Sequence, residues 1–270
     1  MENIILPTKN TWCPGCGNFG IQGALKSVIE ERGKDKIAIV TGIGCHGKMA
    51  DYLNVNSFYS LHGRAIPTAV GVKIGNEELD VICCAGDGDA YNEGIAHLIH
   101  SAKRNSNITL IVHDNHAFAL TVKQATSTSP RGFKGSTTPE GSIEDPINPL
   151  EMMLSIDTTF IARGYSGKKE HLSNIIKEGI NHKGFSFIEV LQPCIAWHNT
   201  YADYNNRTYE MEENFLSYEK AREKIREWDY SNNESKIPLG IFYKKEKETF
   251  EEQMGKVYPA NIEDLLEKNR

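Results

Sequence analysis

The chain has 270 residues, of which 39% are hydrophobic and 24% are charged, and its formal net charge is −6. This length allows one sizeable core, so one main domain is expected. The mild acidity and the lack of a run rich in Lys and Arg argue against nucleic acid or an anionic membrane surface as partners. No stretch approaches the ~18 apolar residues of a membrane span, and the start of the chain lacks the pattern of a signal peptide. We therefore expect a cytoplasmic protein.

Short apolar runs, bounded by Gly, Asp or Pro, alternate with amphipathic segments of helical length. In chain order the pattern predicts helix 19–33, strands 36–44 and 79–86, helix 92–105, strand 108–115, helices 148–157 and 169–184, and strand 185–193. Strands separated by helices imply parallel strands joined by right-handed crossovers. The predicted fold class is α/β, with a mostly parallel sheet flanked by helices.

Two stretches depart from this alternation. Residues 121–146 are dense in Ser, Thr, Gly and Pro, and a loop of this length inside a compact domain is usually functional, so we interpret it as a site loop. After residue 196 the chain becomes polar, and 211–229 is predicted as a surface helix. We therefore divide the chain into a domain over 1–196 and a C-terminal arm over 197–270.

An acidic turn follows the predicted strand 79–86. Gly86 and Gly88 allow a close backbone approach to a phosphate, whereas Asp87 between them suits an anion site only if a cation intervenes. Mg²⁺ resolves this conflict, because it binds carboxylates and amides together with phosphate oxygens. Asn115, 28 residues after Asp87, follows the next predicted strand and is a candidate second ligand. Taken singly, each of these residues is also an ordinary turn residue.

The spacing of this Gly-Asp-Gly and the later Asn resembles the fingerprint of enzymes that use thiamine diphosphate (TPP). The resemblance implies a TPP-binding fold in which Mg²⁺ is held against the diphosphate by Asp87, Asn115 and the carbonyl of Ala117. Four further residues would line the diphosphate: Gly88, Asp89, Ala119 and Leu120. Ala119 stands where many relatives have Gly, so it permits backbone contact only if its φ is negative.

Six cysteines in a cytosolic protein do not predict three disulfides, so those outside the core suggest a metal, cluster or redox role. Cys13-Pro-Gly-Cys16 can aim two thiolates at one metal centre, although a single such pair also fits a redox dithiol or half a zinc site. Cys83 and Cys84 lie in the predicted strand 79–86 and are best explained as small buried hydrophobes.

Several segments together resemble the β subunit of the 2-oxoacid:ferredoxin oxidoreductases. They occur in the order of that family across residues 11–194, and they are "TWCPGCGNFG", "GIGCHGKMADYL", "LHGRAIPTAVGVKIG", "GDGDAYNEG" and "LQPC". The resemblance implies one [4Fe–4S] cluster held by Cys13, Cys16, Cys45 and Cys194. Zinc bound by the same four cysteines remains the alternative.

The resemblance also marks neighbours of the cofactor. It implies that TPP lies near Ile43, Gly44, Cys45, His46 and His62. Lys48, His62 and Arg64 are candidates for catalysis, because the two cations could meet a substrate carboxylate or coenzyme A. A surface lysine or arginine is the ordinary alternative for Lys48 and Arg64.

The implied reaction is the TPP-dependent oxidative decarboxylation of a 2-oxoacid, pyruvate or 2-oxoglutarate, to acyl-CoA and CO₂. Electrons would pass through the cluster to ferredoxin. The rest of the active site would come from an α subunit, or a fused α and γ chain, in a hetero-oligomer. The alternatives are a non-oxidative TPP enzyme, such as a decarboxylase or carboligase, and a non-catalytic zinc-binding scaffold.

Overall fold

The described strands form one sheet in the order β2-β1-β3-β4-β6-β5-β8-β7 in the computed structural model, which describes residues 3–231 and 234–257. Every neighbouring pair is parallel except β5 and β8, which run antiparallel. The predicted α/β class and mostly parallel sheet are confirmed. The strands are β1 (Ile37–Thr41), β2 (Asn56–Tyr59), β3 (Asp80–Gly86), β4 (Thr109–Asp114), β5 (Phe160–Tyr165), β6 (Ser186–Leu191), β7 (Thr208–Glu210) and β8 (Ile237–Lys244).

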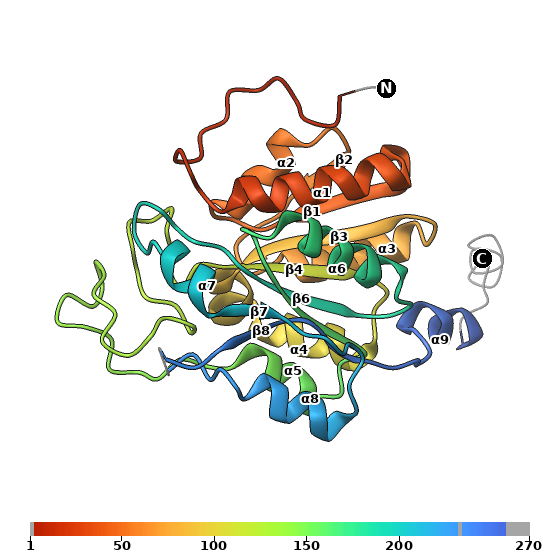
Figure 1. The fold of residues 1–270 in the computed structure, drawn as a ribbon. Coiled ribbons are helices and arrows are strands. Elements are labelled where there is room, and N and C mark those ends of the chain that lie inside the picture. The colour runs from red at the N-terminus through yellow and green to blue at the C-terminus, as the bar shows by residue number, and fades with distance from the viewer. Residues whose placement is uncertain (1–2, 232–233, 258–270) are drawn as a thin grey trace, which may run out of the picture.

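Helices cover both faces of this sheet (Figure 1). None of the helices in the described part of the chain is long and apolar enough to cross a membrane. The α-helices are α1 (Asn18–Arg32), α2 (Met49–Tyr52), α3 (Ala65–Gly75), α4 (Ile95–Arg104), α5 (Pro149–Ser155), α6 (Lys169–Asn181), α7 (Tyr201–Arg207), α8 (Tyr218–Ile225) and α9 (Phe250–Val257). Short 3-10 turns are η1 (Lys34–Lys36) and η2 (His46–Lys48), and η3 (Gly88–Glu93) is a π-helical turn.

Successive side chains of a central strand point to opposite faces of the sheet, so the core has two parts, one on each face. In β3, Val81, Cys83 and Ala85 pack in the core with residues of α3, α4, α5 and α8. Ile82 and Cys84 pack in the core with residues of α1, α2 and α6. Both cysteines are 0% exposed, which confirms their predicted place as small buried hydrophobes and follows from the period of two in a strand.

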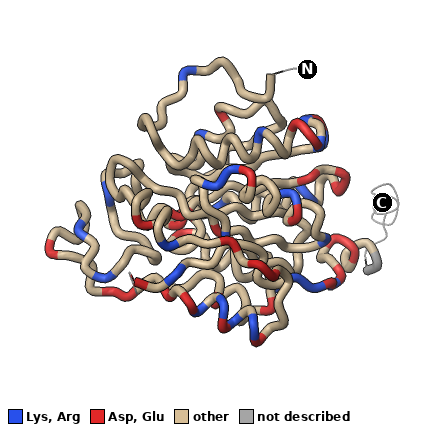
Figure 2. The backbone as a smooth tube through the Cα atoms, in the orientation of Figure 1, with Lys and Arg blue, Asp and Glu red and all other residues tan. Residues whose placement is uncertain are grey.

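The polar C-terminal segment contributes to the sheet. β8 pairs with β5, β7 pairs with β8, and α8 packs on β8 and α5. The surface helix predicted over 211–229 is shorter in the structure, where α8 covers Tyr218–Ile225. Basic residues (Lys and Arg) and acidic residues (Glu) are interspersed along this helix (Figure 2). The division at residue 196 remains a prediction, and residues 258–270 of the predicted arm lie outside the described residues.

A buried ion pair joins the C-terminal segment to the centre of the sheet. The Arg163 Nε of β5 donates to the Glu189 Oε2 of β6 at 2.9 Å, and neither side chain is exposed. Arg163 Nη2 also donates to the hydroxyl of Tyr230 at 3.1 Å, and its guanidinium lies 4.9 Å from the ring centre of Trp228. Because the group is buried, removing one member would leave a charge or a polar atom of another member buried without its partner.

Replacing Arg163 by Met is expected to lower the free energy of unfolding by about 3–5 kcal/mol, because Glu189 is left as a buried and uncompensated charge. Arg226→Met is the matched control, because Arg226 pairs with Glu151 at the surface, where its side chain is 54% exposed. An exposed pair contributes only ~0–1 kcal/mol. Urea unfolding of the assembled protein measures both, and equal losses in the two variants would contradict the role of the buried pair.

Candidate functional site

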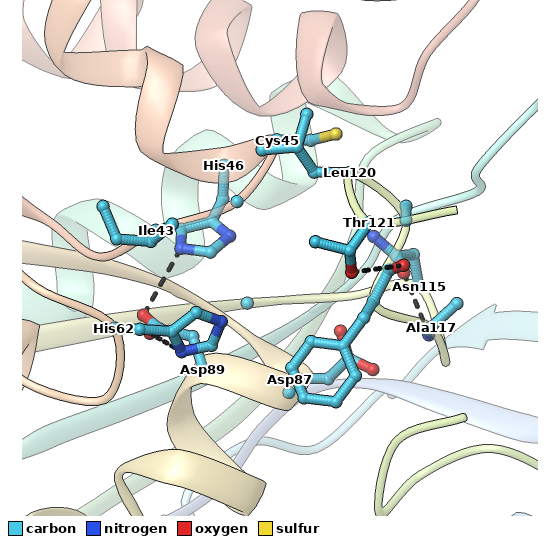
Figure 3. Close-up of a pocket in the computed structure, with 15 residues that line it drawn as sticks. Ile43, Cys45, His46, His62, Asp87, Asp89, Asn115, Ala117, Leu120 and Thr121 are labelled. Carbon is cyan, nitrogen blue, oxygen red and sulfur yellow. Dashed lines mark hydrogen bonds and ion pairs between the residues drawn. The ribbon is translucent and has the colours of Figure 1, made fainter. Parts of the chain in front are cut away.

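The candidate site lies at the carboxyl ends of β1, β3 and β4. The chain leaves β1 toward β2 on one side of the sheet and continues from β3 to β4 on the other, so this edge is a switch point of the kind at which open α/β sheets bind ligands. A cavity opens there (Figure 3). The residues predicted to bind TPP or Mg²⁺ all line it: Ile43, Gly44, Cys45, His46, His62, Asp87, Gly88, Asp89, Asn115, Ala117, Ala119 and Leu120.

Asp87 is a buried carboxylate, 1% exposed, at the end of β3. Its Oδ2 accepts hydrogen bonds from Thr126 Oγ1 at 2.6 Å and Thr128 Oγ1 at 3.2 Å. Burial raises the pKa of Asp87 well above its usual value, and the nearby Asp114 carboxylate raises it further. Both threonines belong to the predicted site loop, which therefore reaches the carboxylate, although the sequence did not single them out.

Asn115, at the end of β4, has both ends of its amide engaged. Its Oδ1 accepts from the backbone N–H of Ala117 at 3.0 Å, and its Nδ2 donates to Gln192 Oε1 at 3.0 Å. Gln192 follows β6 directly, so three adjacent strand ends meet here. Neither Gln192 nor its contact with Asn115 was anticipated from the sequence.

The donors around Asp87 suit a hard divalent cation. A carboxylate, an amide oxygen and a backbone carbonyl at Asp87, Asn115 and Ala117 are oxygen ligands of the kind that Mg²⁺ takes. Asp87 accepts hydroxyl hydrogen bonds and has no cationic side chain as an ion-pair partner among the described residues. No group of three His, Cys, Asp or Glu side chains in the described ranges is arranged to hold a metal ion. The fit therefore rests on the mixed oxygen set.

On the other side of the cavity, Asp89 binds residues of the two loops that carry His46 and His62. Its carboxylate lies 3.0 Å from His62 Nδ1 and 3.4 Å from His46 Nε2, and it accepts the Gly63 N–H at 2.6 Å. Figure 3 shows Asp89 between the two histidines. A Cβ at position 42 would lie 1.7 Å from Asp89 Oδ2, so Gly42 is required for this approach.

Gly88 and Ala119 contribute backbone to the wall of the cavity. A Cβ at Gly88 would lie 2.3 Å from the ring of Phe118, so a larger residue at position 88 would have to displace that ring. Ala119 is not among the residues with positive φ, which meets the condition set by the sequence. Phe118 and Thr121 also line the cavity and were not foreseen.

The four cysteines assigned by resemblance line a second cavity, with a volume of about 170 Å³. Cys13 and Cys16 precede α1, Cys45 follows β1, and Cys194 follows β6. All four are free thiols in the structure. Burial, with a smaller contribution from the other three cysteines, raises the pKa of Cys16 to about 11. The two cavities share lining residues, namely Cys45, Asn115, Ala119 and Leu120.

The two candidate cationic residues, Lys48 and Arg64, differ in their position relative to the cavities. Lys48 lines the cysteine cavity, where burial raises the pKa of Cys45 and the Lys48 charge opposes that rise. Arg64 precedes α3 as an exposed residue whose Nη1 donates to the Gly63 carbonyl at 3.2 Å. Arg64 lines neither of the two cavities. Its catalytic role therefore stays a prediction without a contact to the site.

Comparisons with known proteins identify the family to which the chain belongs. Residues 42–190 match the family model "Thiamine pyrophosphate enzyme, C-terminal TPP binding domain", and residues 194–258 match the model for the C-terminal part of the pyruvate ferredoxin oxidoreductase beta subunit. The chain is 37% identical to the 2-oxoacid:ferredoxin oxidoreductase subunit beta of Saccharolobus solfataricus, over 94% of this chain and 88% of that protein. It is 38% identical to the 2-oxoglutarate synthase subunit KorB of Methanothermobacter thermautotrophicus, over 78% and 75% of the two chains.

A solved structure covers nearly the whole fold. The 2-oxoglutarate:ferredoxin oxidoreductase from Magnetococcus marinus, with 2-oxoglutarate, coenzyme A and succinyl-CoA bound, superposes with a TM-score of 0.90 and 28% identity. The match covers 99% of this chain and 94% of that one. The fold, the long matches in sequence and both family models point the same way. The chain belongs to the family of 2-oxoacid:ferredoxin oxidoreductase beta subunits, and it is one subunit of an oxidoreductase.

Proposed function

We propose that this chain holds TPP by its diphosphate in the first cavity and a [4Fe–4S] cluster in the second. The observation that carries this proposal is that the two cavities adjoin and share Cys45 and Asn115. A cofactor that releases electrons would thereby lie next to a centre that accepts them. A non-oxidative TPP enzyme needs no such second cavity, and a zinc scaffold needs no first one.

In this proposal Asp87, Asn115 and the Ala117 carbonyl hold Mg²⁺ against the diphosphate. Thr126 and Thr128 orient the Asp87 carboxylate through their hydroxyl groups. Asp89 keeps His46 and His62 at the wall of the cavity, so that both imidazoles face the space for the cofactor. When bound, TPP supplies the carbon that adds to the 2-oxo group and the electron sink for loss of CO₂.

Cys13, Cys16, Cys45 and Cys194 are the proposed cluster ligands. Four thiolates are the ligand set of a [4Fe–4S] cluster. Cys₄ ligation also suits zinc, and the adjoining TPP cavity is what favours a redox centre over a structural ion. A neighbouring cation helps to keep thiolates ionised, and Lys48 supplies one beside Cys45.

The proposed substrates are a 2-oxoacid and coenzyme A, with ferredoxin as electron acceptor. Relatives are named for 2-oxoacids or for 2-oxoglutarate, and the similar solved structure contains 2-oxoglutarate and coenzyme A. Pyruvate and 2-oxoglutarate both remain in this proposal. Lys48 and His62 line the cavities and are the side chains best placed to meet a substrate.

Free thiols and an iron–sulfur cluster suit a reducing compartment, so a cytoplasmic location is part of the proposal.

An α subunit, alone or fused with γ, is the proposed partner at this edge of the sheet. Large apolar side chains that line the cysteine cavity are exposed, including Val122 at 55%, Leu120 at 49% and Ile195 at 40%. Exposed apolar residues that gather beside a site are typical of a surface that another chain covers. The partner would supply the carboxylate that TPP requires at its aminopyrimidine ring.

Asp87→Ala is expected to weaken TPP binding at limiting Mg²⁺ by more than about 100-fold, because even residues that only orient a metal ligand affect affinity by 10–100-fold. Its iron content is expected to stay at the wild-type value, since no thiolate is lost. Asp145→Ala is the control, because Asp145 is an exposed carboxylate in the same loop. Calorimetric titration with Mg²⁺ and TPP measures the affinity, and wild-type affinity in Asp87→Ala would refute the ligand assignment.

Cys45→Ala and Cys194→Ala are each expected to lose the [4Fe–4S] cluster, while Cys84→Ala keeps it. Cys84 is the matched control, because it is a buried free cysteine in β3 that lines neither cavity. Iron and sulfide analysis of anaerobically purified protein measures the cluster. The four-cysteine assignment fails if either of the first two variants retains the full iron content, or if the wild type contains zinc in place of iron.

The chain without its partner is expected to show no 2-oxoacid turnover, because the carboxylate for the aminopyrimidine ring comes from the other subunit. Isolated chain and assembled protein are each reconstituted with cluster, Mg²⁺ and TPP. Reduction of a viologen dye that depends on the 2-oxoacid and coenzyme A is then compared. Full specific activity of the isolated chain would contradict the shared site.

A further inference from the structure

One side chain touches both proposed metal sites. Gln192 follows β6, is 1% exposed, and lies between Asn115 and Cys16. Its Oε1 accepts from Asn115 Nδ2 at 3.0 Å, and its Nε2 lies 3.6 Å from Cys16 Sγ as a donor. Nε2 also donates to the Pro193 carbonyl at 2.8 Å. Every polar atom of this amide therefore has a partner.

Backbone groups fix the direction of this amide. The Ala117 N–H can only donate, so it requires the Asn115 oxygen and turns the Asn115 nitrogen toward Gln192. That nitrogen in turn requires the oxygen of Gln192. The nitrogen of Gln192 then faces the Pro193 carbonyl, which can only accept, and the Cys16 sulfur. The assignment of oxygen and nitrogen thus follows from two backbone groups at its ends.

We propose that Gln192 is a positioning residue that couples the TPP–Mg²⁺ site to the cluster. This inference rests on the proposed function, because it needs Asn115 at the Mg²⁺ and Cys16 at the cluster. Through its oxygen Gln192 holds the Asn115 amide in the orientation that presents Oδ1 to the metal. Through its nitrogen it stabilises negative charge on the sulfur of Cys16.

The contact of Gln192 Nε2 with Cys16 Sγ predicts in which direction Gln192 shifts the reduction potential of the cluster. Reduction of an iron–sulfur cluster adds negative charge to the cluster and its thiolates, and hydrogen bonds to the sulfurs stabilise that charge. The N–H of Gln192 therefore raises the potential of the cluster. The same amide restrains Asn115, so a change at the Mg²⁺ site reaches Cys16 through one side chain.

Two variants separate these contacts. Gln192→Glu keeps an oxygen for Asn115 but has at most one proton, which the Pro193 carbonyl would take, so the sulfur loses its donor in either protonation state. Gln192→Met keeps the length of the side chain but loses both contacts. Gln22→Met is the matched control, because Gln22 is also buried and lines neither cavity. Potentials are measured in the assembled protein by redox titration followed by electron paramagnetic resonance, without substrate.

Both Gln192 variants are expected to lower the ratio of reduced to oxidised cluster at a fixed potential by about tenfold, a shift of about 59 mV to lower potential for one electron. Gln192→Met is also expected to weaken Mg²⁺ binding at saturating TPP by about 10–100-fold, whereas Gln192→Glu and Gln22→Met bind Mg²⁺ as the wild type does. Unchanged potentials in both Gln192 variants, or unchanged Mg²⁺ affinity in Gln192→Met, would overturn the coupling alone. A wild type without an iron–sulfur signal would overturn the proposed function as well.

Discussion

The parallel register of β1, β3, β4 and β6 is the constraint on which the rest of the site depends. Pairings such as Gly86 with His113 and Asp114 with Leu191 end these strands at nearly the same level. Whatever residues come next are delivered to one edge of the sheet. The segments that begin at Gly42, Asp87, Asn115 and Gln192 therefore meet there, although up to 150 residues separate them in the sequence. Both cavities are consequences of this convergence.

The buried carboxylates at this edge show where a cation is needed. Burying a charge without a partner is strongly unfavourable. Glu189 has Arg163 as its partner, and Asp89 has two imidazoles and a backbone N–H. Asp87 accepts from two threonine hydroxyls, and Asp114 beside it raises its pKa further. A divalent cation bound at Asp87 would offset this cost, and the structure around it supplies neutral oxygen atoms for the same ion.

The sequence predicted the parts of the fold whose signals are local. Strands such as β3 are apolar runs bounded by turn residues, and the acidic turn and the cysteines carry recognisable spacing. β5 was missed because Arg163 interrupts its apolar pattern, and only the structure shows that Glu189 on the next strand compensates that charge. α3 was missed as a helix because Pro67 and Gly71 weaken its pattern.

Contacts between distant side chains could not be predicted. The site loop was recognised by its composition, but its path determines that Thr126 and Thr128, among its many hydroxyl residues, reach Asp87. Gln192 lies inside a recognised motif, yet its two contacts depend on the crossing of three chain segments. Such contacts follow from the tertiary arrangement rather than from any local pattern of residues.

The most direct test of the central claim is anomalous diffraction at the iron edge from crystals of the anaerobically assembled protein with Mg²⁺ and TPP. The account predicts an iron peak in the cavity lined by Cys13, Cys16, Cys45 and Cys194. It also predicts the diphosphate of TPP in the adjoining cavity, with Mg²⁺ bound to Asp87 and Asn115. Iron elsewhere, or a diphosphate that does not approach Asp87, would contradict the claim that this sheet edge brings the two cofactors together.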